Sequence, residues 1–144
     1  MNTADVTAAP SSIIIKGQTY LLSPLTDGDF GEFERWAQDR YMNVAKRNLE
    51  GLTTEQQQIV LTGAVESAAR ITITTPQALQ LMTSLEGAGL LVYLSLRHRH
   101  PDLEKSTVMN WLTDPKILKA TMDRIDRLNA VKKRGRRKRK RGRQ

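Results

Sequence analysis

The chain contains no cysteine and only two histidines among its 144 residues. Without cysteine, a disulfide framework, a thiolate metal site and a cysteine nucleophile are all excluded. The two histidines, His98 and His100, cannot form a three-histidine zinc site within one chain, and their two-residue spacing directs them to different sides of a helix. We therefore expect no metal and no cofactor.

Long hydrophobic runs and aromatic residues are also scarce, and aromatic residues make up 5% of the chain. The longest apolar run, residues 88–96, is interrupted by Ser95 and is much shorter than the ~18 residues that span a bilayer. The first twelve residues contain Asp5 and Pro10 and lack the basic and apolar regions of a secretory signal. We therefore expect an intracellular protein without a membrane span.

Acidic residues are missing from the last part of the chain, so its charge is unevenly distributed. The formal net charge is +8, from 23 Lys and Arg and 15 Asp and Glu. Residues 132–143 alone carry +10, which leaves −2 for the rest. The ten basic residues of this tail are Lys132, Lys133, Arg134, Arg136, Arg137, Lys138, Arg139, Lys140, Arg141 and Arg143.

A run of this density predicts a polyanionic partner. The tail has no asparagine, glutamine or aromatic residue between residues 132 and 143, so we expect it to contact phosphates rather than base edges. Acidic protein surfaces and anionic lipids are alternative partners. Short Lys/Arg runs also serve as nuclear localisation signals.

Two β-like runs, residues 13–15 and 19–22, flank Lys16-Gly17-Gln18. Their β-branched and aromatic residues around a glycine-containing turn predict a hairpin. Helical signals follow. Thr26 precedes apolar residues that recur mainly at three- and four-residue steps, which are Phe30, Phe33, Ala37, Tyr41, Val44 and Leu49. They predict a helix with one buried stripe.

Thr53 or Thr54, each followed three residues later by Gln, predicts the start of a second helix. One side of it carries Ile59, Val60, Gly63, Ala64 and Ser67, whose small members would let another helix approach closely. After a short extended signal at residues 71–74, Thr75-Pro76 starts a third helix. Ala78, Leu81, Met82 and Leu85 are its expected buried face.

Residues 87–96 fit either a buried helix or a core strand. We favour a helix, because Arg97-His98-Arg99-His100 suits a helix C-terminus and Pro101 stops it. Asp102 and Asp114-Pro115 then predict a short helix and a last longer one. Altogether we expect a mainly α fold with a short N-terminal β hairpin. Residues 1–12 form a flexible lead, 13–130 a single mostly helical domain, and 131–144 a disordered basic tail.

Two internal features are candidate sites. The first is the cluster Arg97, His98, Arg99 and His100, a secondary anion-binding patch or simply a solvated helix end. The second is Trp36, which lies slightly off the main stripe of its helix and is a candidate protein interface, whereas Trp111 is expected in the core. No Ser-His-acid arrangement or glycine-rich phosphate loop is recognisable, so we expect no enzyme activity.

The segment from Leu90 to Leu103 reads LLVYLSLRHRHPDL. It resembles the helix-to-helix junction of tail assembly chaperones from long-tailed bacteriophages, in which an apolar helix ends in a basic patch and a His-Pro-Asp-Leu-like stop precedes the next helix. The residues Leu103-Glu104-Lys105-Ser106 depart from the Thr or Ser start of the family's next helix, and the basic tail is not a family feature.

This resemblance implies a non-catalytic protein of the host cytoplasm or the virion. Such chaperones coat the hydrophobic tape-measure protein before the tail tube forms, and they self-associate. The alternative is a nucleic-acid-binding viral structural or assembly protein whose tail contacts the genome. A transcription regulator is a third class, but the helix junctions show no convincing helix-turn-helix.

Overall fold

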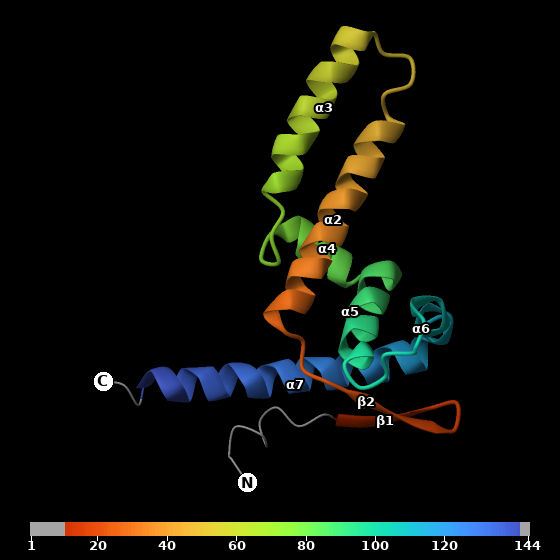
Figure 1. Ribbon diagram of the computed structural model, residues 1–144, viewed down its shortest axis with the longest axis vertical. Helices are drawn as coiled ribbons and strands as arrows, with labels where there is room; N and C mark the ends of the chain where they lie inside the picture. Colours follow the sequence, from red (N-terminus) through yellow and green to blue (C-terminus); the bar gives the residue numbers. More distant parts are fainter. Residues whose placement is uncertain (1–10, 142–144) are drawn as a thin grey trace. The chain divides into compact units, whose positions relative to one another are not determined.

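The computed structural model describes the backbone of residues 11–141 and the side chains of residues 11–130. Within these residues it contains one two-stranded hairpin and six helices, labelled β1, β2 and α2–α7 (Figure 1). The predicted mainly α class with an N-terminal hairpin is confirmed.

The fold divides into two compact units, and the continuous sequence of the second interrupts the sequence of the first. Unit 1 combines the N-terminal segment up to Thr26 with the chain from Ser84 onward, and unit 2 comprises Asp27–Thr83. The sequence predicted a single helical domain over residues 13–130, and one cooperative domain stays a prediction.

The hairpin of unit 1 pairs β1 (Ser11–Ile15) with β2 (Gln18–Leu22) in antiparallel register, with Ile13 opposite Tyr20. Lys16 and Gly17 connect the strands, and their φ angles of 49° and 80° both lie in the left-handed region. A two-residue turn of this kind matches the twist of the strands, and glycine adopts it at no steric cost. Ile13 and Ile15 are buried, whereas Ile14 faces outward and is 73% exposed.

Helix α5 (Leu85–Arg97) is the core of unit 1, and the open choice between helix and strand for residues 87–96 is thereby decided for a helix. Its N-cap is Ser84, whose side chain accepts a hydrogen bond from the Gly87 amide. Nine of its residues are buried. A Cβ at Gly89 would overlap the Met109 side chain, so this glycine permits the close approach of α6 (Lys105–Trp111).

Hydrogen bonds between distant residues fasten the remaining elements of unit 1. Ser95 Oγ donates to the Ser23 carbonyl at 2.6 Å, and the Ser23 amide donates to the Ser95 carbonyl at 3.2 Å. Helix α7 (Pro115–Arg141) lies beside the hairpin (Figure 1). Its Arg124 donates to Ser11 Oγ at 3.0 Å, and its Asn129 accepts from the Leu25 amide at 3.2 Å.

Unit 2 is a helical hairpin of α2 (Asp27–Arg47) and α3 (Thr54–Ala69), followed by the short helix α4 (Pro76–Met82). The Gln38 side chain donates to the Ile71 carbonyl at 3.1 Å, and a Glu34 oxygen accepts from the Ile73 amide at 2.7 Å. These bonds hold the segment that follows α3 against α2. Near the connecting loop, the Gln57 side chain donates to the Leu49 carbonyl at 3.2 Å.

Several details differ from the sequence-based expectations. Residues 71–74 form no strand, because the Thr75 amide donates to the Thr72 carbonyl at 3.0 Å and closes a turn there. Leu85 is 44% exposed rather than buried, because α4 ends at Met82 and Leu85 is the first residue of the next helix, α5. Glu104 rather than Asp102 is the N-cap of α6.

Candidate functional site

The predicted polyanion-binding residues of the tail, from Lys132 to Arg143, lie outside the residues whose side chains the structure describes. The bounds of α7 extend to Arg141. Residues 1–10 of the predicted flexible lead and residues 142–144 of the predicted disordered tail lie outside the described residues. Ser11 and Ser12 belong instead to β1, and the backbone of residues 131–141 continues α7. The functional role of the ten cations is therefore inferred from the sequence alone.

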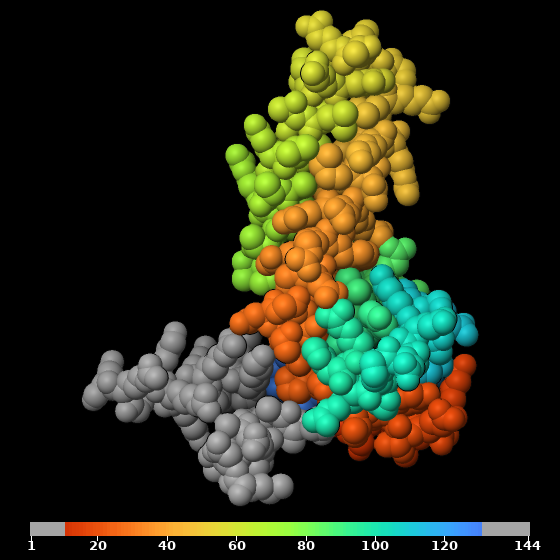
Figure 2. Space-filling view, viewed as in Figure 1, coloured from red at the N-terminus to blue at the C-terminus, as the bar shows by residue number. Residues whose placement is uncertain are grey.

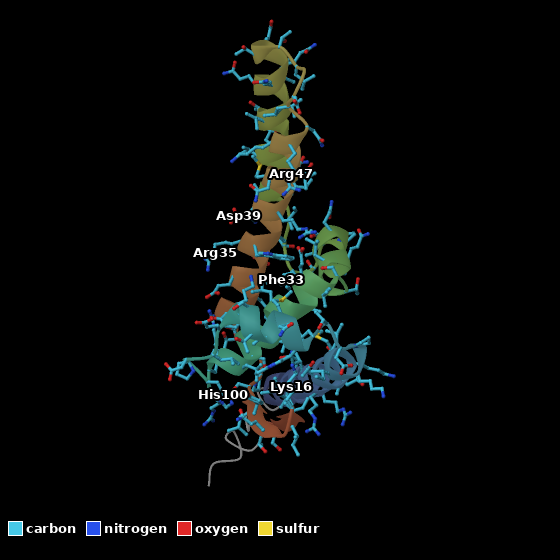
Figure 3. The ribbon with its side chains drawn as sticks, turned by 90° about the vertical axis from the view of Figure 1, so that its right-hand side faces the viewer. Lys16, Phe33, Arg35, Asp39, Arg47 and His100 are labelled. Carbon is cyan, nitrogen blue, oxygen red and sulfur yellow. The ribbon has the colours of Figure 1, made fainter. Side chains whose placement is uncertain are left out.

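The candidate anion patch at the end of α5 is divided between two environments. Arg97 is the last helical residue and is half-buried, and His98 and Arg99 are exposed. His100 instead turns toward the hairpin, where its Nε2 accepts the Leu21 amide at 2.9 Å (Figure 3).

Aromatic contacts complete the environment of His100. Its ring meets the Tyr20 ring edge-on, with centroids 5.2 Å apart, and Tyr20 packs against Trp111 at 4.8 Å. Trp111 is buried, as the sequence predicted for a core residue. His100 thus joins the hairpin to the helices of unit 1, which is a structural role that sequence reasoning missed.

Trp36, the predicted interface residue, is half-buried on α2. Its ring packs against buried Phe33 with centroids 5.3 Å apart, and the Arg40 guanidinium lies 5.6 Å from its ring centre. Cation–π contacts of this kind are worth about 0.5–1 kcal/mol at exposed sites. Trp36 is therefore engaged within α2, and its role at an interface stays a prediction.

A more open feature of unit 2 is a groove of about 420 Å³ between α2 and α3. The two helices that form it pack side by side (Figure 2). Three residues of α2, Asn48 directly after it and four residues of α3 line the groove, and none of them is charged. They are Tyr41, Val44, Ala45, Asn48, Val60, Gly63, Ala64 and Ser67.

Large apolar side chains stand exposed along this groove. Tyr41 is 39% exposed, Val44 49% and Val60 38%, and the neighbouring Ile59 is 68% exposed. A Cβ added at Gly63 would meet nothing within 4 Å, so the space above this glycine is open. Apolar side chains gathered around an open hollow are typical of a helix-binding groove.

Part of this groove was predicted from the sequence. Gly63, Ala64 and Ser67 were recognised as a face that another helix could approach. Tyr41 and Val44 were expected on a buried stripe, but both are exposed because α3 presents mainly small residues to that stretch of α2. The mismatch between large residues on α2 and small ones on α3 leaves the groove open.

The described residues contain few groups that could bind a metal or act as an acid or a base. Residues 11–130 contain no group of three or more His, Asp or Glu side chains that could hold a metal ion. On α7, partial desolvation and, second, the negative charge of Asp123 raise the pKa of the Asp126 carboxyl above its ordinary value. Asp126 is exposed on α7.

No single helix among the described residues is both long and apolar enough to cross a bilayer. Helices α4 and α5 reach that length and apolarity only as a pair, and they are bent by 78° relative to each other. Nine residues of α5 are buried within the protein.

The chain was compared with protein-family models, with curated proteins and with solved structures, and none of these matches it.

Proposed function

We propose that this protein is a non-catalytic assembly protein that binds a helical segment of a partner protein in the α2–α3 groove. The observation that carries the proposal is the exposure of Tyr41, Val44 and Val60 around the open space at Gly63. A partner helix that buries these side chains would remove apolar surface from water, at about 25 cal/mol for each Å².

The class of partner comes from the resemblance of residues 90–103 to tail assembly chaperones of long-tailed bacteriophages. Such a protein would bind a tape-measure-like structural protein during virion assembly, in the host cytoplasm or on the virion. An uncharged groove suits this task, because apolar helices of different sequence can occupy it without a matching charge.

A second function is favoured by the ten cations between residues 132 and 143. In this alternative, the protein is a nucleic-acid-binding viral structural or assembly protein whose tail neutralises phosphates of the genome. The two functions are compatible in one chain, since the groove and the tail are separate in sequence.

Site-specific photo-crosslinking tests the first function. A benzophenone amino acid replaces Val60 in the groove or, as the control, Val65 on the same helix; both side chains are exposed. The full chain is irradiated in the cells that express it, and the adducts are identified by mass spectrometry.

We expect an adduct between position 60 and a long apolar helical protein, and no such adduct from position 65. Adducts with capsid subunits or packaged nucleic acid alone would favour the second function. The absence of any adduct with another protein at position 60 would contradict the proposed partner binding.

A further inference from the structure

We infer that the basic end of α7, residues 132–141, binds duplex DNA as a helix in the major groove, with two rows of cations toward the two phosphate strands. The inference rests on the second proposed function, because it takes the tail to bind nucleic acid and names the form of nucleic acid and the bound conformation. The sequence predicted a disordered tail, but α7 is one helix from Pro115 to Arg141 and contains nine of the ten cations (Figure 1).

The order of residues in the tail has a helical period. Between residues 131 and 143, only Val131, Gly135 and Gly142 are not lysine or arginine. These three are separated by four and seven residues, which is the spacing of residues on one side of an α-helix. An unfolded arm that neutralises phosphates does not need this pattern, because its charges act at any spacing. The pattern therefore favours a helix as the functional form of the tail.

The cations of the basic end form three rows along the helix, each with the spacing i, i+4 and i+7. At about 100° per residue, the centres of the first and second rows lie roughly 160° apart on the side that carries Gly135, and the third row lies opposite Gly135. The three rows are, in order, Lys132, Arg136 and Arg139; Arg134, Lys138 and Arg141; and Lys133, Arg137 and Lys140.

The described side chains of α7 show where its packing against unit 1 ends. Thr121 and Ile125 are buried and Leu128 is half-buried, all on one side of the helix. At helical spacing, the next residues on this side are Lys132 and Arg136. Charged side chains do not extend an apolar core, so the buried side of α7 ends before Lys132.

Unit 1 fastens α7 directly before the cations. Asn129 accepts a hydrogen bond from the Leu25 amide at 3.2 Å. Asp123 and Asp126 are exposed on the preceding turns, and their carboxylates would repel phosphates. The region that contacts DNA therefore begins beyond Asp126.

The major groove of B-form DNA has the dimensions to receive this helix. The groove is about 12 Å wide, and an α-helix with its side chains is about 10–12 Å across. A helix in the groove has one phosphate strand on each flank, so the first and second rows face phosphates when the side of Gly135 faces the bases. Glycine has no side chain and lets this side approach closely, and the third row then faces away from the DNA.

Other forms of nucleic acid match the helix less well. Duplex RNA has a deep, narrow major groove that side chains do not read. A single strand lacks the second row of phosphates, and residues 131–141 contain no aromatic residue on which its bases could stack. We therefore expect the full chain to bind duplex DNA more tightly than single-stranded DNA or duplex RNA of equal length.

Titrations of the full chain on duplex DNA at several salt concentrations test the rows. Two triple variants each remove three charges, and glutamine is used because it keeps a high helix propensity. The first-row and third-row variants are Lys132→Gln/Arg136→Gln/Arg139→Gln and Lys133→Gln/Arg137→Gln/Lys140→Gln.

Each engaged cation contributes about −0.9 to the log–log salt slope, so the six cations of two rows give a slope of about −5. The first-row variant should make this slope shallower by about 3 and weaken binding about tenfold or more at about 100 mM salt. The third-row variant should leave the slope and the affinity nearly unchanged.

Two substitutions of Gly135 test the helix without a change of charge. Proline breaks a helix interior, whereas alanine favours it. We expect Gly135→Pro to weaken binding to duplex DNA about tenfold or more and Gly135→Ala to bind at least as tightly as the unchanged protein. Equal melting temperatures of the two variants show that the packed part of the chain is intact.

Equal losses from the two triple variants, or unchanged binding by Gly135→Pro, would overturn the inference and leave the second function intact, since an unfolded arm behaves in this way. Tighter binding to single-stranded DNA or duplex RNA would overturn the assignment to the major groove. Absence of binding to all three nucleic acids would contradict the second function and the inference together. The first function is tested separately by the adducts at position 60.

Discussion

At the scale of single residues, the sequence indicates that His100 belongs to a basic surface patch, but the structure places it half-buried against the hairpin. Its Nε2 accepts the Leu21 amide, and its ring touches Tyr20, which is 80 positions earlier in the chain. No pattern in Arg97-His98-Arg99-His100 distinguishes the last histidine from the first. The difference arises only when β2 folds back against the end of α5.

We predict that His100→Phe lowers the free energy of unfolding by about 1–2 kcal/mol, because it keeps an aromatic ring but leaves the Leu21 amide without its acceptor. Chemical denaturation of the full chain measures the change. Arg99→Phe is the control, since it places the same side chain on the exposed neighbouring residue, and we expect it to change stability by less than about 0.5 kcal/mol. Equal effects of the two variants would contradict a structural role for His100.

At the scale of elements, the starts of the helices are the best-determined features. Helix α3 begins with a complete capping box, in which the Thr53 hydroxyl accepts the Gln56 amide at 3.2 Å and the Gln56 side chain accepts the Thr53 amide at 3.0 Å. Both groups lie within four residues of each other, so the motif is visible in the sequence.

Thr53→Ala should therefore destabilise α3 by about 1 kcal/mol, because it removes one half of this box and loosens the other. Hydrogen exchange of the α3 amides measures the local effect. Thr54→Ala is the matched control, since Thr54 is exposed and gives no capping bond to the helix. A larger loss of protection from Thr54→Ala would show that the helix starts one residue later than described.

Features that depend on residues close in the sequence could be predicted, whereas features that depend on distant residues could not. The hairpin turn at Gly17 and the proline starts at Pro76 and Pro115 depend on neighbouring residues, and they lie where the sequence placed them. The groove depends instead on which residues of α3 face Tyr41 and Val44. Helical periodicity predicted an apolar stripe on α2 but not that part of it lacks a large partner.

At the scale of the whole molecule, the separation of charge is the dominant feature. The tail carries +10 and the rest of the chain −2, so a polyanion is attracted to one end of the sequence only. Attraction between phosphates and a dense cluster of cations releases counterions and therefore weakens steeply as salt is added.

We predict that the full chain binds duplex DNA with a log–log salt slope of about −5 to −7, which corresponds to roughly six to eight engaged cations, and with little sequence preference. Titrations on two unrelated duplexes at three salt concentrations measure the slope. Deleting residues 131–144 should abolish this binding and leave the melting temperature nearly unchanged. A flat salt response, or equal affinity after the deletion, would show that the tail serves another purpose.

Unit 2 lies in the sequence between the two parts of unit 1, so these two parts are synthesised at different times. Residues 11–25 of unit 1 leave the ribosome before unit 2, but their hydrogen-bond partners Ser95, Arg124 and Asn129 follow about 70–110 residues later. At roughly 5–20 residues per second, the hairpin waits several seconds or longer without the helices that cover it. Unit 2 has mainly neighbouring contacts and emerges within that interval, so α2 and α3 can pair while the hairpin is still waiting. The groove would then exist on the nascent chain before the first strand has found its place.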